Sequence, residues 1–355
     1  MKRKVVIISS AVFFAVTTAF GLQKEESSEY NVRTIAFYNL ENLFDTHNDS
    51  LSFDDARTPK GKDRWTRNRY LQKIGNLAKV ISLIGQETRT TGPDIIGLCE
   101  LENAEVIRDV FKHDYLLNQD YGFIHYESPD ERGIDVALAY KKSSFTSFSH
   151  KSHRLLLENE KGYRDYTRDL LVVGGMLESD ELYILVNHWP SRSGGERRSS
   201  PYREAAARLN IQVLDSIRRL SPNSSIIIMG DFNDNPTNRS IKHILRTRDD
   251  PSELKEDELF NPMEKLYRKG IGSLGYRDQW HMFDQILLSK KLASPNPNHY
   301  FLWKAGVFNP PFLITKHGPY AGYPKRTYAS GIYQNGFSDH FPVFIYLIKP
   351  FKEKG

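Results

Sequence analysis

Side chains that can bind a metal ion or transfer a proton stand at the ends of several short apolar runs in this chain. They are Asn39, Glu41, Glu100, His188, Asp231, Asn233, Asp284, Asp339 and His340. A single polar residue after a strand is usually a turn former, because Asn and Asp side chains bond to their own backbone. Strands of an α/β protein, however, gather their ends along one edge, where binding crevices form. Carboxylates, carboxamides and imidazoles at so many strand ends therefore predict one shared site.

The segment from Gly230 to Asn233 illustrates the pattern. It follows the run Ile226–Met229, which is apolar enough for a central strand. Gly230 permits a sharp exit from that strand, and Asp231 and Asn233, two positions apart, can face the same way. The alternative is an Asx-turn that closes the strand, and the Asp-Asn-Pro sequence at 234–236 could supply such a turn by itself.

The elements that must position these residues are short strands and two long helices. Strands are predicted at Thr34–Tyr38, Asp94–Cys99, Asp135–Tyr140, Leu182–Val186, Ser225–Met229, Gln285–Leu288 and Pro342–Ile348. Apolar residues at helical spacing predict helices over Arg67–Ile84 and Tyr202–Leu220. Because some strands follow one another without a helix between them, a sandwich of mixed sheets fits better than a pure βαβ repeat. The segment Asn296–Asn335, rich in Pro, Gly and Tyr, is expected to be a loop.

The composition is that of a soluble protein with a sizeable core. Of the 355 residues, 39% are hydrophobic and 26% are charged. The 49 basic and 44 acidic side chains give a net charge of +5, which is a weak argument for a polyanionic partner. The single cysteine, Cys99, excludes an internal disulfide, and its apolar neighbours favour a core position over a nucleophilic role.

The first residues are typical of a secretory signal peptide. A positive region, Lys2–Lys4, precedes an apolar stretch from Val5 to Phe20 and a polar run that follows it. We therefore expect a signal peptide at 1–22, a short polar linker at 23–30 and a single domain at 31–350, in a secreted or periplasmic protein. The alternative is an uncleaved N-terminal anchor, for which the stretch is somewhat short. No later segment is long and apolar enough to span a membrane, so no stable membrane insertion is expected after cleavage.

Seven short motifs occur in the order found in the endonuclease/exonuclease/phosphatase superfamily, which this chain resembles. They are YNLENLFD at 38–45, LCE at 98–100, RGIDVA at 132–137, NHWP at 187–190, GDFN at 230–233, FDQI at 283–286 and SDHFP at 338–342. One such motif would be weak, but the ordered set covers essentially the whole chain after the predicted linker. The resemblance implies a four-layer α/β sandwich of deoxyribonuclease I type, with two mixed β-sheets face to face and helices outside. It also implies that 31–350 is a catalytic domain.

The resemblance implies a divalent metal centre. Glu100 would be the principal ligand, with Asn39, Glu41 and Asp339 assisting. Glu41 departs from the aspartate that some relatives have at this place. Oxygen ligands of this kind suit Mg²⁺, with Mn²⁺ as a substitute and Ca²⁺ as an alternative.

The remaining motif residues are given acid–base and electrostatic roles by the same resemblance. Asp231 would orient and deprotonate the attacking water, and Asn233 would steady the water or the phosphate. Asp284 would fix and charge His340, since a carboxylate on one imidazole nitrogen favours the cation, and His188 would contribute from the opposite side.

Arginines follow His188 closely, and they bear on the substrate. Arg192, Arg197, Arg198 and Arg203 alternate with Trp189 and Tyr202. Guanidinium groups match phosphate geometry and aromatic rings stack on bases, although such a loop is equally often a solvated surface. Arg132, in the RGIDVA motif, is a further substrate-binding candidate, or pairs with a nearby acid. We take Arg132, Arg192 and Arg197 as the predicted substrate-binding residues.

These observations predict a monomeric, metal-dependent hydrolase of phosphodiesters or phosphomonoesters that acts by in-line attack of water. DNA is the favoured substrate, because an exported enzyme with an arginine-rich loop suits extracellular nucleic acid. A phosphatase or phosphodiesterase of a lipid head-group, inositol or sugar phosphate is the alternative. A non-catalytic binding module of the same fold is a weaker one, because the motif positions keep competent chemistry. A Ser–His hydrolase ranks last, since no Gly-x-Ser-x-Gly elbow follows a strand.

Overall fold

Two seven-stranded sheets form the centre of the molecule in the computed structural model, which describes residues 5–6, 29–88 and 90–351. The first sheet has the order β17-β20-β2-β3-β5-β4, and β1 pairs with β2. Its strands are β17 (Phe301–Val307), β20 (Val343–Pro350), β2 (Glu29–Leu43), β3 (Ile95–Leu101), β5 (Asp135–Lys141), β4 (Tyr121–His125) and β1 (Val5–Val6). Within it β2 and β3 run parallel, whereas the other pairs are antiparallel.

The second sheet has the order β12-β13-β16-β11-β10-β9-β6. Its strands are β12 (Thr247–Arg248), β13 (Leu259–Phe260), β16 (Asp284–Ser289), β11 (Ser225–Asp231), β10 (Asp180–His188), β9 (Leu170–Leu177) and β6 (Phe145–His153). The central pair β10 and β11 is parallel. Three small hairpins project from the sandwich: β7 (Leu157–Glu158) with β8 (Arg164–Asp165), β14 (Leu274–Tyr276) with β15 (Gln279–His281), and β18 (Tyr328–Ala329) with β19 (Ile332–Tyr333).

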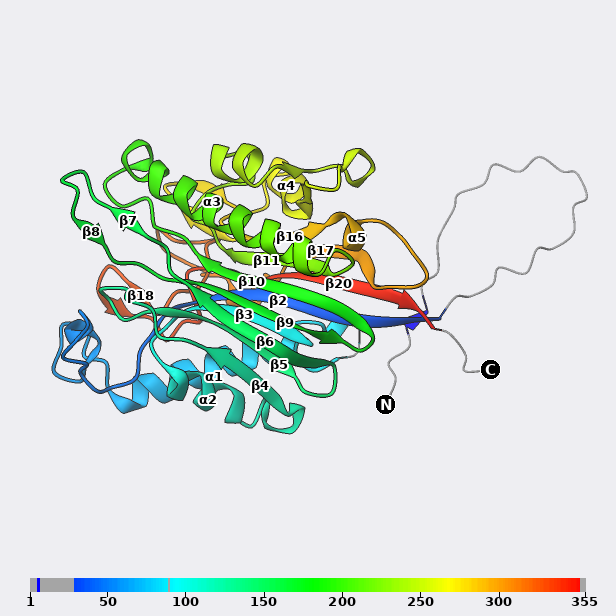
Figure 1. Ribbon diagram of the computed structural model, residues 1–355. Coiled ribbons are helices and arrows are strands. Elements are labelled where there is room, and N and C mark those ends of the chain that lie inside the picture. The colour runs from blue at the N-terminus through cyan, green and yellow to red at the C-terminus, as the bar shows by residue number, and fades with distance from the viewer. Residues whose placement is uncertain (1–4, 7–28, 89, 352–355) are drawn as a thin grey trace, which may run out of the picture.

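Helices cover the outer faces of both sheets, which gives four layers (Figure 1). On one side lie α1 (Arg67–Leu83) and α2 (Ala104–Lys112), and on the other lie α3 (Glu196–Leu220) and α4 (Pro262–Arg268); the short α5 (Lys290–Ala293) follows β16. The predicted four-layer α/β sandwich is therefore confirmed.

The alternation of side chains along each strand produces this layering. In β2, Ile35 belongs to the apolar cluster between the two sheets, whereas Ala36 belongs to the cluster under α1 and α2. In β11, Ile227 points into the central cluster and Ile228 into the cluster beneath α3. Strands that are apolar on both faces must be covered on both faces, so the sequence runs found above require a sandwich with outer helices.

The predicted elements coincide with observed ones, with differences at their ends. The helix predicted from Tyr202 begins at Glu196 instead and carries Pro201 inside. The prediction of a loop over Asn296–Asn335 is wrong in part, because Phe301–Val307 forms the edge strand β17 and 328–333 contains the β18–β19 hairpin. The half-exposed strand β17 pairs on one side only, so its apolar signal is weak.

The predicted signal peptide at 1–22 lies outside the described residues apart from the two residues of β1. Of the predicted linker at 23–30, only Glu29 and Tyr30 are described, and they begin β2. These boundaries stay predictions. Among the helices of the described part, none has the length and apolar character needed to cross a membrane.

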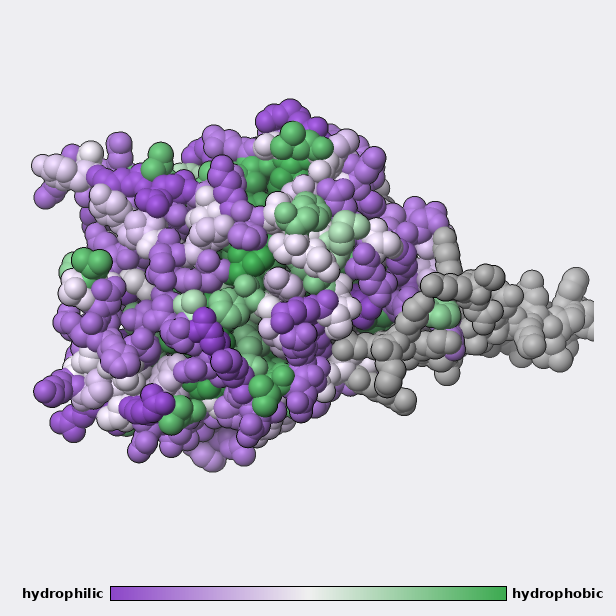
Figure 2. Space-filling model, turned by 60° about the horizontal axis from the view of Figure 1, so that its bottom comes forward, coloured by the Kyte–Doolittle hydropathy of each residue, from purple (hydrophilic) through white to green (hydrophobic). Residues whose placement is uncertain are grey.

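The face turned forward in Figure 2 is largely hydrophilic, with hydrophobic residues gathered in patches through its middle.

Candidate active site

One edge of the sandwich collects the ends of the strands that carry the predicted site residues. Because β10 and β11 run parallel, His188 and Asp231 are register partners at their last residues. Because β16 runs antiparallel to β11, its first residue, Asp284, is the partner of Asp231 on the other side. Three site residues thus stand side by side across one sheet, as the strand-end pattern predicts.

The facing sheet delivers its residues through irregular backbone. The pairing of β2 with β3 shifts between Asn39 and Leu43, and that of β3 with β5 shifts between Cys99 and Leu101. Glu41, Asn42 and Glu100 have φ of 52°, 51° and 58°, and Asn233 in the second sheet has φ of 49°. The left-handed conformation costs a non-glycine residue roughly 1–2 kcal/mol. Such strain gathers at functional sites, and a bulge of this kind re-aims the side chain that it carries.

Asp231 is contacted by residues from both sheets. Its Oδ2 accepts a hydrogen bond of 3.0 Å from the Asn39 amide of the first sheet, and its Oδ1 accepts the backbone N–H of Asn233 at 2.9 Å. The Nε2 atoms of His188 and His340 lie 3.9 and 4.0 Å from Oδ2. Burial raises the pKa of this carboxyl to about 7, although the neighbouring His340 acts in the opposite direction. A carboxylate with its pKa near neutrality suits a general base.

His340 is held as a cation. Its Nδ1 lies 2.6 Å from Oδ2 of Asp284, which also accepts the Ser273 hydroxyl at 2.5 Å. Burial alone would lower the imidazole pKa, but the Asp284 carboxylate, followed by Asp231, outweighs it and raises the pKa of His340 well above its ordinary value. The predicted pair of Asp284 and His340 is therefore present, with Nε2 left facing Asp231.

His188 is held neutral instead. Its side chain is buried, and burial together with the guanidinium groups of Arg168 and Arg132 lowers its pKa well below the ordinary value. Nε2 lies 3.7 Å from Oε1 of Glu100, while Nδ1 has no hydrogen-bond partner within the described part of the chain. The two imidazoles on either side of Asp231 thus differ in charge, and only His340 offers a positive charge to an anion.

The donor atoms at this edge fit a hard divalent cation. Glu100 and Asp231 offer carboxylate oxygens on either side of His188 Nε2. The amide oxygen of Asn39 accepts the Glu41 N–H at 2.8 Å, and one Asp339 oxygen accepts from Arg326. Glu100 is 14% exposed and binds the Asn42 N–H through Oε2, so that its Oε1 faces His188 and the site. The buried Cys99 thiol lies close to His188 and Asp231, and burial raises its pKa well above the ordinary value. The oxygen-rich set matches the preference of Mg²⁺.

Glu41 lies in a different environment from Glu100. Its Oε2 accepts the backbone N–H of Thr327 at 2.6 Å and lies 3.4 Å from Nζ of the buried Lys73. This carboxylate ties the segment after β17 to the end of β2. Its role as a metal ligand stays a prediction, and the hydrogen bonds show a positioning role. Asp339 in turn accepts a hydrogen bond of 2.6 Å from Arg326.

The arginine-rich segment is mostly engaged in internal ion pairs. Arg192 donates to the Asn233 carbonyl, Asp234, Glu196 and Asn238, Arg198 pairs with Glu160, and Arg203 pairs with Asp234 while fully buried. Arg197 is exposed. The sequence argument for nucleic acid assumed that these arginines were free to bind phosphate. In the structure three of the four form ion pairs with carboxylates of the protein itself.

Two further arginines, Arg132 and Arg168, pair with Asp130 in the connection between β4 and β5. Arg132 is 45% exposed and lies 3.6 Å from Asp130, and its effect on the pKa of His188 places its charge near that ring. Arg168 is a residue that the sequence reasoning missed. It is buried between Asp130 and the Trp189 carbonyl, at 2.9 and 2.7 Å. It stands just before the apolar run of β9, so the strand-end pattern could have found it.

The sandwich and its polar edge define an α/β fold of the deoxyribonuclease I type. Over residues 34–349 the sequence matches the family described as the Endonuclease/Exonuclease/phosphatase family, and the chain belongs to that family. This match confirms the resemblance seen in the sequence motifs. Members of the family hydrolyse phosphoester bonds. No curated protein sequence matches the chain significantly.

Solved structures share the fold at low sequence identity. TDP2 from D. rerio, complexed with a single-strand DNA product, is 16% identical with a TM-score of 0.53, and the match covers 89% of this chain and 98% of that one. A family protein from Bacteroides thetaiotaomicron is 17% identical with a TM-score of 0.53, covering 91% and 100%. A mannosyl-6-phosphatase from Bacteroides thetaiotaomicron VPI-5482 is 19% identical with a TM-score of 0.51, covering 89% and 99%.

Proposed function

We propose that this protein is a metal-dependent phosphoesterase that hydrolyses its substrate by in-line attack of water. The observation that carries the proposal is the position of Asp231, a buried carboxylate with a pKa of about 7 that lies between a cationic and a neutral imidazole. Such a group can take a proton from water while a neighbouring cation holds the anionic phosphoryl group.

Each residue at the site has a separate role in the proposed reaction. Asp231 accepts the proton of the attacking water, and the Asn39 amide and Asn233 N–H, which bind its two oxygens, hold the carboxylate in place. The Nε2–H of His340, charged by Asp284, donates to a phosphoryl oxygen, where negative charge grows in the transition state. Neutral His188 donates or accepts a hydrogen bond from the other side without adding charge.

Glu100 and Asn39, with Asp339, would hold Mg²⁺ or Mn²⁺. When bound there, the ion would supply positive charge that offsets the negative charge of the reacting phosphoryl group. The bent backbone at Glu100 supports this assignment, because it aims a carboxylate with one uncommitted side at the same space as His188.

Two substrate classes deserve testing first. DNA is supported by the D. rerio structure that holds a single-strand DNA product, although its 16% identity carries only the fold. A sugar phosphate is supported in the same way by the mannosyl-6-phosphatase. Because three of the four arginines in this segment form ion pairs within the protein, the charge of the segment does not favour DNA over a sugar phosphate as the substrate.

Export completes the proposal. The positive and apolar N-terminal residues support a cleaved signal peptide at 1–22 and a location in the periplasm or outside the cell. We take the exported enzyme to be a monomer. N-terminal sequencing of the protein from the producing cell's exterior, with size-exclusion chromatography, tests both statements.

The activity is tested with a substrate panel in Mg²⁺ and in excess chelator. Single-stranded DNA, RNA, a phospholipid, mannose 6-phosphate and bis(p-nitrophenyl) phosphate cover the candidate classes. We expect hydrolysis in Mg²⁺ and none in chelator. Full activity in exhaustive chelator would exclude the metal mechanism, and no activity on any ester would exclude the proposed function.

A further inference from the structure

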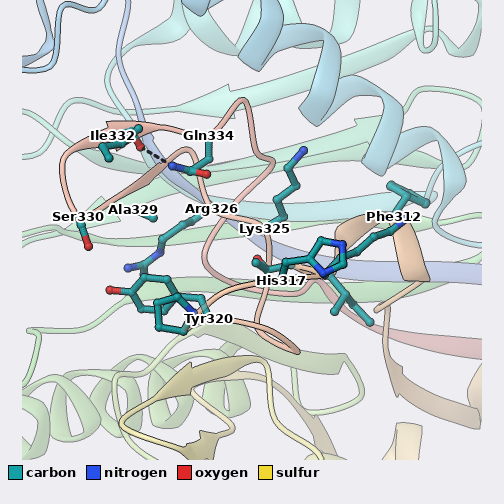
Figure 3. Close-up of a pocket in the computed structure, with 13 residues that line it drawn as sticks. Phe312, His317, Tyr320, Lys325, Arg326, Ala329, Ser330, Ile332 and Gln334 are labelled. Carbon is teal, nitrogen blue, oxygen red and sulfur yellow. Dashed lines mark hydrogen bonds between the residues drawn. The ribbon is translucent and has the colours of Figure 1, made fainter.

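The segment between β17 and β20 forms a pocket of about 640 Å³ beside the catalytic edge (Figure 3). Its thirteen lining residues all lie between Phe312 and Gln334 and include none of the predicted site residues. Figure 3 shows Arg326 and Tyr320 toward one end of the pocket, and His317 with Phe312 toward the other.

The charge of this pocket is one-sided. Lys316, Lys325 and Arg326 line it together with His317, and none of its thirteen lining residues is Asp or Glu. The ammonium group of Lys79 lies 5.2 Å from the ring of Phe312, which adds a further positive charge nearby. Clustered cations without internal carboxylates attract an anion, and guanidinium and ammonium groups are the usual partners of phosphate.

A second pocket near the arginine-rich segment shows that this is not a general property of the surface. That pocket contains Arg197 and Arg198 but also Glu158, Glu160 and Glu196. Arg198 is bound to Glu160 there at 2.8 Å. The positive charge in the second pocket is therefore compensated by the protein itself. In the first pocket Arg326 is bound to Asp339, whereas Lys316 and Lys325 have no carboxylate partner among the described residues.

A third pocket, of about 440 Å³, adjoins the first pocket, called the cationic pocket from here on, on the side of Asp339. It shares Pro319, Tyr320 and Arg326 with the cationic pocket and extends to Asp339, the neighbour of His340. Arg326 forms the boundary, since it donates to Asp339 at 2.6 Å. The walls between are aromatic, with Tyr276 and Tyr323 beside Tyr320. Tyrosine rings of this kind stack on bases and pack against the faces of sugars.

Both pockets are fixed to the catalytic strands. Glu41 at the end of β2 accepts the Thr327 N–H, and the buried Lys73 donates to Thr327 Oγ1 at 2.7 Å and to the Phe337 carbonyl at 2.5 Å. The Tyr323 hydroxyl accepts the N–H of Asp278 from the β14–β15 hairpin at 2.7 Å. A pocket held at several points is preformed, which reduces the cost of binding.

We propose that the cationic pocket binds a second phosphate group of the substrate, with the intervening ring in the adjoining aromatic pocket. This inference rests on the proposed function, because the first phosphate is the one hydrolysed at Asp231. The substrate class is thus a phosphoester with a further phosphate one ring away. A nucleotide strand and a sugar bisphosphate share that chemistry.

The test compares matched pairs of ligands by calorimetry in chelator, so that no turnover occurs. The first pair is thymidine 3′,5′-bisphosphate and thymidine 5′-phosphate, and the second is fructose 1,6-bisphosphate and fructose 6-phosphate. The variant is K316Q/K325Q. The control is K142Q/K291Q: Lys142 follows β5 at the end opposite Asp135, and Lys291 lies in α5 and binds the Asn223 carbonyl just before β11.

We expect the wild type to bind one bisphosphate at least about tenfold tighter than its monophosphate, the gain of one charge-assisted hydrogen bond. K316Q/K325Q should lose that preference, and K142Q/K291Q should keep it. The pair that shows the preference identifies a nucleotide or a sugar. Equal binding of both members of each pair by the wild type, or a preference that survives in K316Q/K325Q, would overturn the inference. Failure to hydrolyse every ester of the substrate panel in Mg²⁺ would instead overturn the proposed function and leave the binding result standing.

Discussion

Removing the charge of Asp284 should disable His340 without removing its ring. The carboxylate lies 2.6 Å from Nδ1 of His340, the two side chains are 0% and 7% exposed, and Asp284 is the main group that raises the pKa of this imidazole. In Asp284→Asn the ring stays, but it loses the partner that keeps it charged. Since one buried hydrogen-bond donor to developing charge contributes about 10²–10³ in turnover, we expect a loss of about 10² in Asp284→Asn and about 10³ in His340→Ala.

The two losses should not multiply, because Asp284 acts through His340. Independent effects would reduce turnover about 10⁵-fold in the double variant, whereas we expect about 10³-fold, which is a coupling of about 2.7 kcal/mol at 1.36 kcal/mol per tenfold change. Turnover is measured under saturating substrate and metal for the four proteins of the cycle, with folding checked by circular dichroism. His125→Ala is the matched control, since His125 forms a similar buried pair with Asp135 at 2.9 Å. Strictly multiplicative losses for Asp284 and His340 would refute the pairing, as would an equal loss of turnover in His125→Ala.

Three further predictions concern the metal, the arginines and the anchor of the loop. Glu100→Gln should raise the Mg²⁺ concentration needed for half-maximal rate at least about tenfold, because a ligand charge is lost, and an unchanged metal titration would remove Glu100 as principal ligand. Arg197→Gln should flatten the slope of log affinity for DNA against log salt by about 0.9, and Arg192→Gln, whose guanidinium is bound internally, should change it less; an unchanged slope in both variants would remove the segment from DNA binding. Lys73→Met should lower the free energy of unfolding by about 3 kcal/mol in urea titrations, because it leaves the buried Glu41 carboxylate unpaired, and a second change, Glu41→Gln, should restore part of that loss. Unchanged stability in Lys73→Met would mean that Glu41 needs no cation.

The layered fold could be predicted because it depends on local patterns. Runs such as Ile226–Met229 are apolar on both faces, and the helical spacing in Tyr202–Leu220 leaves one face to cover them. The edge strand β17 escaped prediction because it pairs on one side and is half exposed, so its sequence lacks the continuous apolar run of a central strand.

The parts of the site that depend on strand pairing could be predicted from the sequence. The parts that depend on side-chain hydrogen bonds in loops could not. His188, Asp231 and Asp284 come together through strand register alone. The engagement of Arg192 with Asp234 and Asn238 depends on loop geometry, which spacing in the sequence does not reveal. Ser273, which binds Asp284, gave no signal, because it lies outside every motif and does not end an apolar run.

The central claim is that Asp231 activates the attacking water. The most direct test is the single-turnover rate of bis(p-nitrophenyl) phosphate hydrolysis in saturating Mg²⁺, for the wild type and Asp231→Asn. The substitution keeps the shape of the side chain but removes the proton acceptor. We predict a rate at least about a hundredfold lower, with little change in substrate affinity. A rate near that of the wild type would show that the water is activated elsewhere and would contradict the assignment of roles at this site.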